Sequence, residues 1–110
     1  MATTYKVLGQ SNPSATTATT LYTVPSATSA VVSTITICNQ ASSAATFRIA
    51  VRPAGATLAA QHYIVYGATV AASDTTTLTL GLTLATTDVI TVYASSANLS
   101  FNAFGSEITA

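Results

Sequence analysis

Hydrophobic and polar residues alternate along much of this chain with a period of two. In residues 47–51 the apolar side chains of Phe47, Ile49 and Val51 are separated by Arg48 and Ala50, and residues 77–84 and 88–93 alternate in the same way. Successive side chains of a strand point to opposite faces of a sheet, so this pattern predicts half-buried β-strands. We expect strands at residues 4–9, 20–25, 30–39, 45–52, 61–66, 68–71, 75–82, 88–94 and 98–105.

Residues typical of turns separate these segments, for example Asn12-Pro13, Pro25-Ser26 and Ser73-Asp74. Eight or nine short strands with such spacing predict an all-β fold, an antiparallel β-sandwich or jelly roll, in a single domain spanning residues 1–110. We expect Gly67 to mark a turn between two strands and Gly81 a bend or bulge within one. The Ala-rich segment 54–61 is expected to form a short helical turn.

Charged side chains are scarce. Three Lys or Arg and three Asp or Glu make up 5% of the chain, and the formal net charge is zero, whereas soluble domains average about 25% charged residues. The polar strand positions hold mostly Thr, Ser and Ala, and a hydroxyl costs far less to bury than a charge. We therefore expect an interaction or assembly module that forms a homo-oligomer. A merely Thr-rich free surface is the alternative interpretation.

The same composition disfavours several classes of partner. Nucleic-acid binding requires a basic surface, which three cations do not supply. No apolar run approaches the roughly 20 residues of a membrane-spanning helix, so we expect no membrane partner. The first ten residues contain one Lys and lack the apolar stretch of a signal peptide, so we expect synthesis in a cytoplasm.

No cofactor or metal is expected. The single cysteine, Cys38, cannot form an intramolecular disulfide, and with the single histidine, His62, it does not supply the Cys and His cluster of a zinc site. No phosphate-binding Gly-x-x-x-x-Gly-Lys motif occurs. We expect Cys38 to be a small apolar residue, buried or at an interface, rather than a reactive thiol.

We also expect the protein not to be an enzyme. A Ser-His-Asp hydrolase built on His62 would lack the Gly-x-Ser-x-Gly elbow. A glycosidase would need two of the carboxylates of Asp74, Asp88 and Glu107, and each of these lies beside a predicted turn or near the chain terminus. We expect these carboxylates to be solvated or to cap turns, and His62 to be a structural or interface residue within a strand.

Arg48 and Arg52 are candidate partner-binding residues. They share one face of a predicted strand, about 13 Å apart, on a chain with few other charges. The guanidinium fork suits a carboxylate of a partner subunit. The alternative is that each Arg pairs within its own chain, with Asp74, Asp88 or Glu107.

Further candidates for partner binding are the tyrosines, because Tyr is enriched at protein interfaces. The chain has five, Tyr5, Tyr22, Tyr63, Tyr66 and Tyr93, of which we single out Tyr63 and Tyr66. A half-buried core Tyr with its hydroxyl at the rim is an equally ordinary role. A sugar-binding aromatic platform is a third interpretation, although no Trp and no neighbouring cluster of acids or amides supports it.

Most of the chain also resembles a known class of proteins. Residues 20–52 are TLYTVPSATSAVVSTITICNQASSAATFRIAVR, and residues 88–94 are DVITVYA. With residues 61–63, 77–84 and 99–108, they resemble a module that recurs in virion proteins of tailed bacteriophages, especially cyanophages and related aquatic phages. The resemblance rests on strand-and-turn patterns rather than on active-site motifs.

This resemblance implies a small β-sandwich that is a structural part of the virion, assembled in the host cytoplasm. The function it favours is that of a capsid decoration, or cement, protein, which stabilises the head by binding the major capsid protein or other virion proteins. The class also implies a homo-oligomer, with a trimer at local threefold positions as one arrangement. A tail, baseplate or fibre-attachment module and a receptor- or glycan-binding β-sandwich are the alternatives. The family pattern supplies no catalytic residues.

Overall fold

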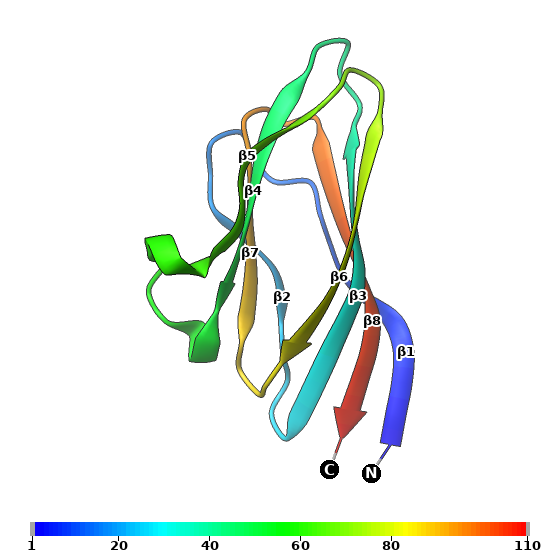
Figure 1. The fold of residues 1–110 in the computed structure, drawn as a ribbon, viewed down its shortest axis with the longest axis vertical. Helices are drawn as coiled ribbons and strands as arrows, with labels where there is room; N and C mark the ends of the chain where they lie inside the picture. Colours follow the sequence, from blue (N-terminus) through cyan, green and yellow to red (C-terminus); the bar gives the residue numbers. More distant parts are fainter. Residues whose placement is uncertain (1, 110) are drawn as a thin grey trace.

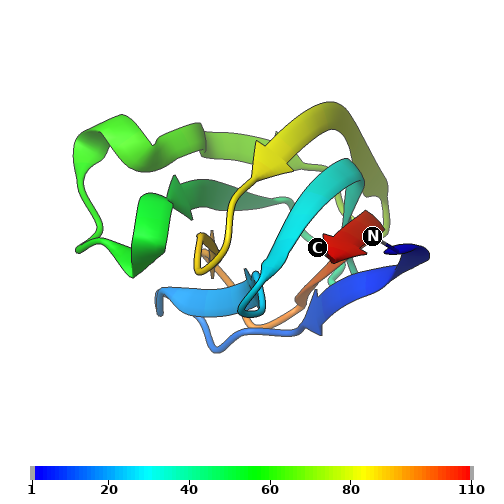
Figure 2. The ribbon, with the colours of Figure 1, turned by 90° about the horizontal axis from the view of Figure 1, so that it is seen from below.

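Two antiparallel β-sheets pack face to face in the computed structural model, which describes residues 2–109 (Figures 1 and 2). Sheet A contains, in spatial order, β1 (Ala2–Ser11), β8 (Leu99–Thr109), β3 (Thr28–Asn39) and β6 (Thr75–Leu84). Sheet B contains β2 (Thr19–Thr23), β7 (Val89–Ala94), β4 (Ala45–Arg52) and β5 (Tyr63–Val70). Two short 3₁₀ turns, η1 (Pro53–Gly55) and η2 (Ala60–His62), lie between β4 and β5.

The order of the strands is that of a jelly roll. The strands of the first half of the chain pair with those of the second half in reverse order, in the antiparallel pairs β1–β8, β2–β7, β3–β6 and β4–β5. The β3–β8 and β4–β7 pairs then join them into two sheets. The prediction of an antiparallel all-β sandwich is confirmed, with eight strands within residues 2–109.

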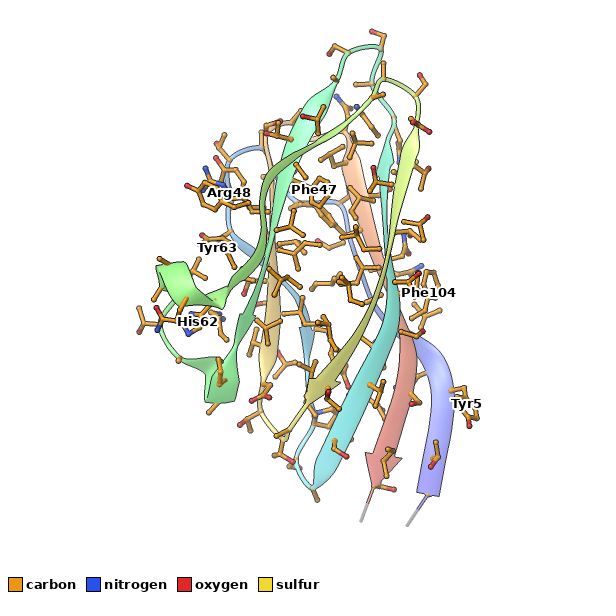
Figure 3. All side chains as sticks on the ribbon, in the orientation of Figure 1. Tyr5, Phe47, Arg48, His62, Tyr63 and Phe104 are labelled. Atoms are coloured by element: carbon orange, nitrogen blue, oxygen red, sulfur yellow. The ribbon has the colours of Figure 1, made fainter. Side chains whose placement is uncertain are left out.

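The inner faces of the two sheets form the core. Ile35 and Ile37 of β3, Phe47 of β4 and Phe101 of β8 are all fully buried, as the alternation predicts. Phe47 of sheet B and Phe101 of sheet A meet edge to face, with ring centroids 6.2 Å apart. Figure 3 shows Phe47 pointing into the space between the sheets. This contact ties the two sheets together at the centre of the sandwich.

A buried amide secures the connection that follows β3. The Asn39 side chain donates hydrogen bonds to the carbonyl oxygens of Ser43 (2.9 Å) and Val70 (3.2 Å), and its oxygen accepts one from the Ala41 N–H (3.0 Å). Asn39 is almost fully buried, and a buried amide is costly unless its hydrogen bonds are satisfied. These bonds hold the turn between β3 and β4 against the end of β5.

Strand β5 is continuous, and the predicted turn at Gly67 was wrong. Phe47 pairs with Ala68 and Arg48 pairs with Tyr66, so Gly67 is an extra residue that forms a β-bulge within the strand. Its φ of +78° is a conformation that glycine adopts at little cost. Gly67 therefore does mark an irregular backbone conformation, as its residue type predicts. The chain does not turn there, however, because β5 pairs with β4 on both sides of Gly67.

Gly81 forms the expected irregularity within β6, with a φ of +63° at a shift in the pairing with β3. The sequence did not predict that this irregularity would place neighbouring leucines on different faces of β6. Leu78 and Leu82 pack against the core, whereas Leu80 is 39% exposed because the shift interrupts the alternation. Instead of the one helical turn expected within residues 54–61, two short 3₁₀ turns, η1 and η2, lie at the ends of this segment, and residues 56–59 between them are not helical. Both turns project outward beside β4 and β5 (Figure 1).

We predict that Phe101→Ala lowers the free energy of unfolding by about 3–5 kcal/mol, because it leaves a cavity where the two sheets meet. Phe104→Ala on the same strand is the control. Phe104 is only half-buried, so we expect a loss of about 1 kcal/mol or less. Urea unfolding followed by circular dichroism measures both values, and equal losses would show that the Phe47–Phe101 contact has no special role.

Candidate functional site

Three of the four residues predicted to bind a partner lie together on the outer face of sheet B. Arg48 of β4 pairs directly with Tyr66 of β5, and the rings of Tyr66 and Tyr63 meet edge to face with centroids 5.0 Å apart. Figure 3 shows Arg48 and Tyr63 on the side of sheet B that faces away from the core. The structure thus gathers Arg48, Tyr63 and Tyr66 into one cluster. Their role in partner binding stays a prediction.

Arg48 stands between two tyrosine rings. In the pairing of the strands it lies opposite Tyr66 on one side and Tyr93 of β7 on the other. The central carbon of its guanidinium lies 4.2 Å from the centroid of the Tyr66 ring and 4.3 Å from that of Tyr93. Both distances are well within the range of cation–π attraction. Tyr66, Arg48 and Tyr93 therefore form a row across three neighbouring strands, the aromatic row.

A second bulge explains how Tyr63 joins this row. Two residues three positions apart on a regular strand face opposite sides of a sheet. In β5, however, Ile49 pairs with Val65 and Ala50 pairs with Tyr63, so Ile64 is an extra residue. Tyr63 and Tyr66 consequently share the outer face while Val65 packs against the core. Neither their common face nor Tyr93 as a neighbour was predicted, because both depend on which strand pairs with which residue.

An open hollow adjoins the aromatic row. Its lining consists of Leu58, Ala59, Ala60, Tyr63 and Tyr66. His62 holds Ala59, one of the lining residues, in place: the His62 Nδ1 accepts a hydrogen bond from the Ala59 backbone N–H at 3.0 Å, and the His62 backbone N–H donates to the Ala59 carbonyl at 3.1 Å. His62 therefore lies in the η2 turn, and its predicted placement in a strand was wrong.

Arg52 shares the outer face with Arg48 but does not join the cluster. Its Nε donates to the Thr91 hydroxyl at 3.1 Å, and its Nη1 donates to the Ala56 carbonyl at 3.0 Å. These bonds hold the loop after η1 against sheet B. The alternative that Arg48 and Arg52 pair with acidic residues of their own chain is wrong, because the one ion pair among residues 2–109 joins Lys6 and Glu107.

A second apolar area lies on the outer face of sheet A. Tyr5 and Val7 of β1 are 84% and 47% exposed, and they border an open hollow that Val31 and Phe104 also line. Figure 3 shows Tyr5 and Phe104 on the side of the molecule opposite Arg48 and Tyr63. Tyr5 and Val7 alternate with Lys6, so the sequence carried a signal for one shared face. Sequence reasoning counted Tyr5 among the tyrosines that could anchor an interface, but it did not predict that Tyr5 and Val7 share an exposed face, because the alternation is compatible with either face being buried.

Two of the three carboxylates serve local backbone structure. Asp88 accepts hydrogen bonds from the N–H groups of Ala54 (2.9 Å) and Ala85 (2.8 Å), and Asp74 accepts one from Thr75 (2.8 Å). The prediction that these two residues cap turns is confirmed.

Glu107 has a different place from the one predicted, because it lies within β8 and contacts the other sheet. Its Oε2 accepts a hydrogen bond from the Tyr22 hydroxyl of sheet B at 2.5 Å, and its Oε1 lies 3.2 Å from Lys6 Nζ. Burial, followed by the hydrogen bond and the charge of Glu107, raises the pKa of Tyr22, so its hydroxyl keeps its proton. The carboxylate thus joins the two sheets near the end of the sandwich where β1 begins and β8 ends.

Within residues 2–109 no group of three or more His, Cys, Asp or Glu side chains is placed to hold a metal ion. Cys38 has a free thiol and is half-buried on β3. No helix in the described part of the chain is long and apolar enough to cross a membrane. Comparisons with protein-family models, with curated proteins and with solved structures give no match.

We predict that the chain loses stability in acid through Glu107. The hydrogen bond from Tyr22 lowers the pKa of this carboxyl, burial opposes that effect, and Lys6 adds to the lowering. A carboxylate with a depressed folded-state pKa stabilises the fold above its unfolded value of about 4.3, and the stabilisation is lost as the pH falls through the folded value. Urea midpoints measured between about pH 6 and pH 3 should therefore fall with acidification.

Tyr22→Phe removes the main cause of the lowered pKa, so its urea midpoint should fall less over the same pH range. Tyr5→Phe is the matched control, since Tyr5 is largely exposed, and it should keep the wild-type pH dependence. An acid-side loss in Tyr22→Phe as large as that of the wild type would contradict the assignment to Glu107.

Proposed function

We propose that this chain is a non-enzymatic structural subunit of a tailed-bacteriophage particle, where it decorates the capsid by binding capsid subunits. The likeness of residues 20–52 and 88–94 to phage virion proteins supports the phage setting. The observation that carries the binding role is the exposure of large apolar side chains on both sheets of a molecule with few charges. Tyr5 and Val7 lie on sheet A, and Ile64 and Tyr66 lie on β5 of sheet B.

The chemistry of these faces suits a permanent contact. Apolar and hydroxyl side chains lose little solvation when another protein covers them, whereas ammonium and carboxylate groups lose much more. The aromatic residues provide large contact areas at low cost in side-chain entropy, as at other interfaces. Few ionic groups would have to be paired or stripped of water when such a face is buried.

Binding on two opposite sides gives the proposed mechanism. A stable contact takes about 800 Å² from each partner, and the chain exposes 5417 Å² in total, so two contacts can be accommodated. A subunit that contacts one capsid protein through sheet A and a second through β5 bridges them, and their separation then requires one of the contacts to break. Self-association, with trimers at local threefold positions as one arrangement, belongs to the same proposal.

The copy number of the chain in purified particles tests the proposed location. We expect a simple ratio to the major capsid protein, as for a subunit that repeats over the whole shell, measured by quantitative mass spectrometry. A few copies per particle would instead place the chain in the tail, baseplate or fibre attachment. Absence from the particle would overturn the phage structural role.

Rebinding to stripped particles tests the two faces. We predict that Tyr5→Ser and Tyr66→Ser each weaken rebinding by about tenfold or more, because exposed aromatic residues commonly anchor interfaces. Leu80→Ser is the matched control: Leu80 is also exposed and apolar, but it lies on β6 at the other edge of sheet A from β1. Wild-type rebinding by both Tyr variants would contradict binding through these faces.

A further inference from the structure

Among residues 2–109, every charged side chain except one forms an ion pair or a hydrogen bond within the chain. Lys6 pairs with Glu107, Asp88 and Asp74 accept backbone hydrogen bonds, and the guanidinium of Arg52 is bound to Thr91 and Ala56. Arg48 makes no ion pair with a described carboxylate. Its contacts are the two rings of the aromatic row, which attract its charge but do not accept hydrogen bonds along the edge of the guanidinium.

The two rings also restrict which part of the Arg48 guanidinium a ligand can contact. The guanidinium carbon lies 4.2 Å from the centroid of the Tyr66 ring and 4.3 Å from that of Tyr93, and the two rings come from the strands on either side of β4. Contact with both rings limits the movement of the group between them. Its N–H donors lie in the guanidinium plane, and that edge is the part left for a ligand. Because the side chain is already held, a ligand that binds there forfeits little side-chain entropy.

We propose that the guanidinium of Arg48, held between Tyr66 and Tyr93, binds the carboxylate of an acidic side chain on the partner protein. That the partner is a protein rests on the proposed function. A carboxylate matches the fork of donors with two parallel hydrogen bonds. The open hollow beside the aromatic row, which Leu58, Ala59 and Tyr63 help to line, then accepts an apolar neighbour of that acidic residue.

The surrounding charges favour a carboxylate over a phosphate group. A phosphate monoester carries a charge of about −1.5 to −2 at neutral pH and several strong acceptors, which a cluster of cations satisfies best. The chain has only three Lys and Arg residues, and Lys6 and Arg52 are engaged elsewhere. One guanidinium in neutral surroundings matches a single negative charge.

Nitrogen-15 NMR tests the proposal directly, because Arg48 and Arg52 give the only two arginine Nε signals of the chain. The probe is the peptide acetyl-Leu-Glu-Leu-amide, with acetyl-Leu-Gln-Leu-amide as its uncharged isostere. We expect the Glu peptide to shift the Arg48 signal in a saturable way, while the Gln peptide does not and the Arg52 signal stays in place. Equal shifts with the two peptides, or an equal shift of Arg52, would overturn the carboxylate site.

Inorganic phosphate and N-acetylneuraminic acid form the other arms of the titration. Tighter binding of phosphate than of the Glu peptide would overturn the choice of a carboxylate. Tighter binding of the acidic sugar would keep the carboxylate but overturn the protein partner. Arg48→Lys keeps the charge but loses the fork, so we expect it to bind the Glu peptide about tenfold more weakly. Arg52→Lys is the matched control and should bind as the wild type does.

Failure of this inference can be told apart from failure of the proposed function. If Arg48→Lys rebinds stripped particles as well as the wild type does, Arg48 does not bind a carboxylate of the partner. The proposed function as a capsid decoration protein is unaffected by that result. If the Glu peptide binds at Arg48 while the chain is absent from particles, the site stands and the phage role is wrong.

Discussion

The whole arrangement depends on burial of one face of each sheet against the other. Phe47, Ile49 and Val92 are fixed inward by the contact with sheet A, and Phe101 and Ile35 by the contact with sheet B. Since successive side chains of a strand point to opposite faces, the residue next to each inward-pointing residue points outward. Arg48 and Tyr93 owe their places on the surface to the burial of the residues beside them, so the aromatic row is a consequence of the core.

Bulges then modify the alternation at the edges of the sandwich. Ile64 and Gly67 in β5 are extra residues opposite β4, and Leu8 is extra in β1 opposite β8. Each bulge changes which side of the strand the following residues face. Tyr63 and Tyr66 meet on one face for this reason. Bulges also disturb the regular edge of a sheet, and β1 and β5 are both edge strands of a chain that has few charges to discourage edge-to-edge pairing.

The scarcity of charge gives each ionic group a distinct position. Glu107 connects the two sheets through Tyr22, and Asp88 joins the turn before β7 to the segment after β4. Arg52 holds the loop after η1. These groups stabilise local structure, whereas Arg48 contacts two aromatic rings and forms no ion pair with a described carboxylate. A surface built in this way favours contacts made by aromatic and hydroxyl groups around one specific charge.

The sequence by itself determined where most of the strands lie and which faces of the regular strands are buried. Alternation of period two is a local property. It placed Ile35 with Ile37, Phe47 with Ile49, and Leu99 with Phe101 on shared faces before any partner strand was known, and all six are buried in the core. It also placed Arg48 and Arg52 on one outer face, and the turn-forming acids Asp74 and Asp88 at the ends of strands. These features depend only on neighbouring residues and on the need to bury apolar surface.

Tertiary structure alone decided which of the outward residues become neighbours. Tyr93 flanks Arg48 because β7 pairs with β4, and the two residues are 45 positions apart. Tyr63 and Tyr66 lie on the same face because Ile64 forms a bulge between them, and nothing in the neighbouring sequence predicts an irregular strand at Ile64. Glu107 meets Tyr22 across the two sheets rather than capping a turn. Strand pairing and register are set by contacts between distant segments, so no window of the sequence contains the information that fixes them.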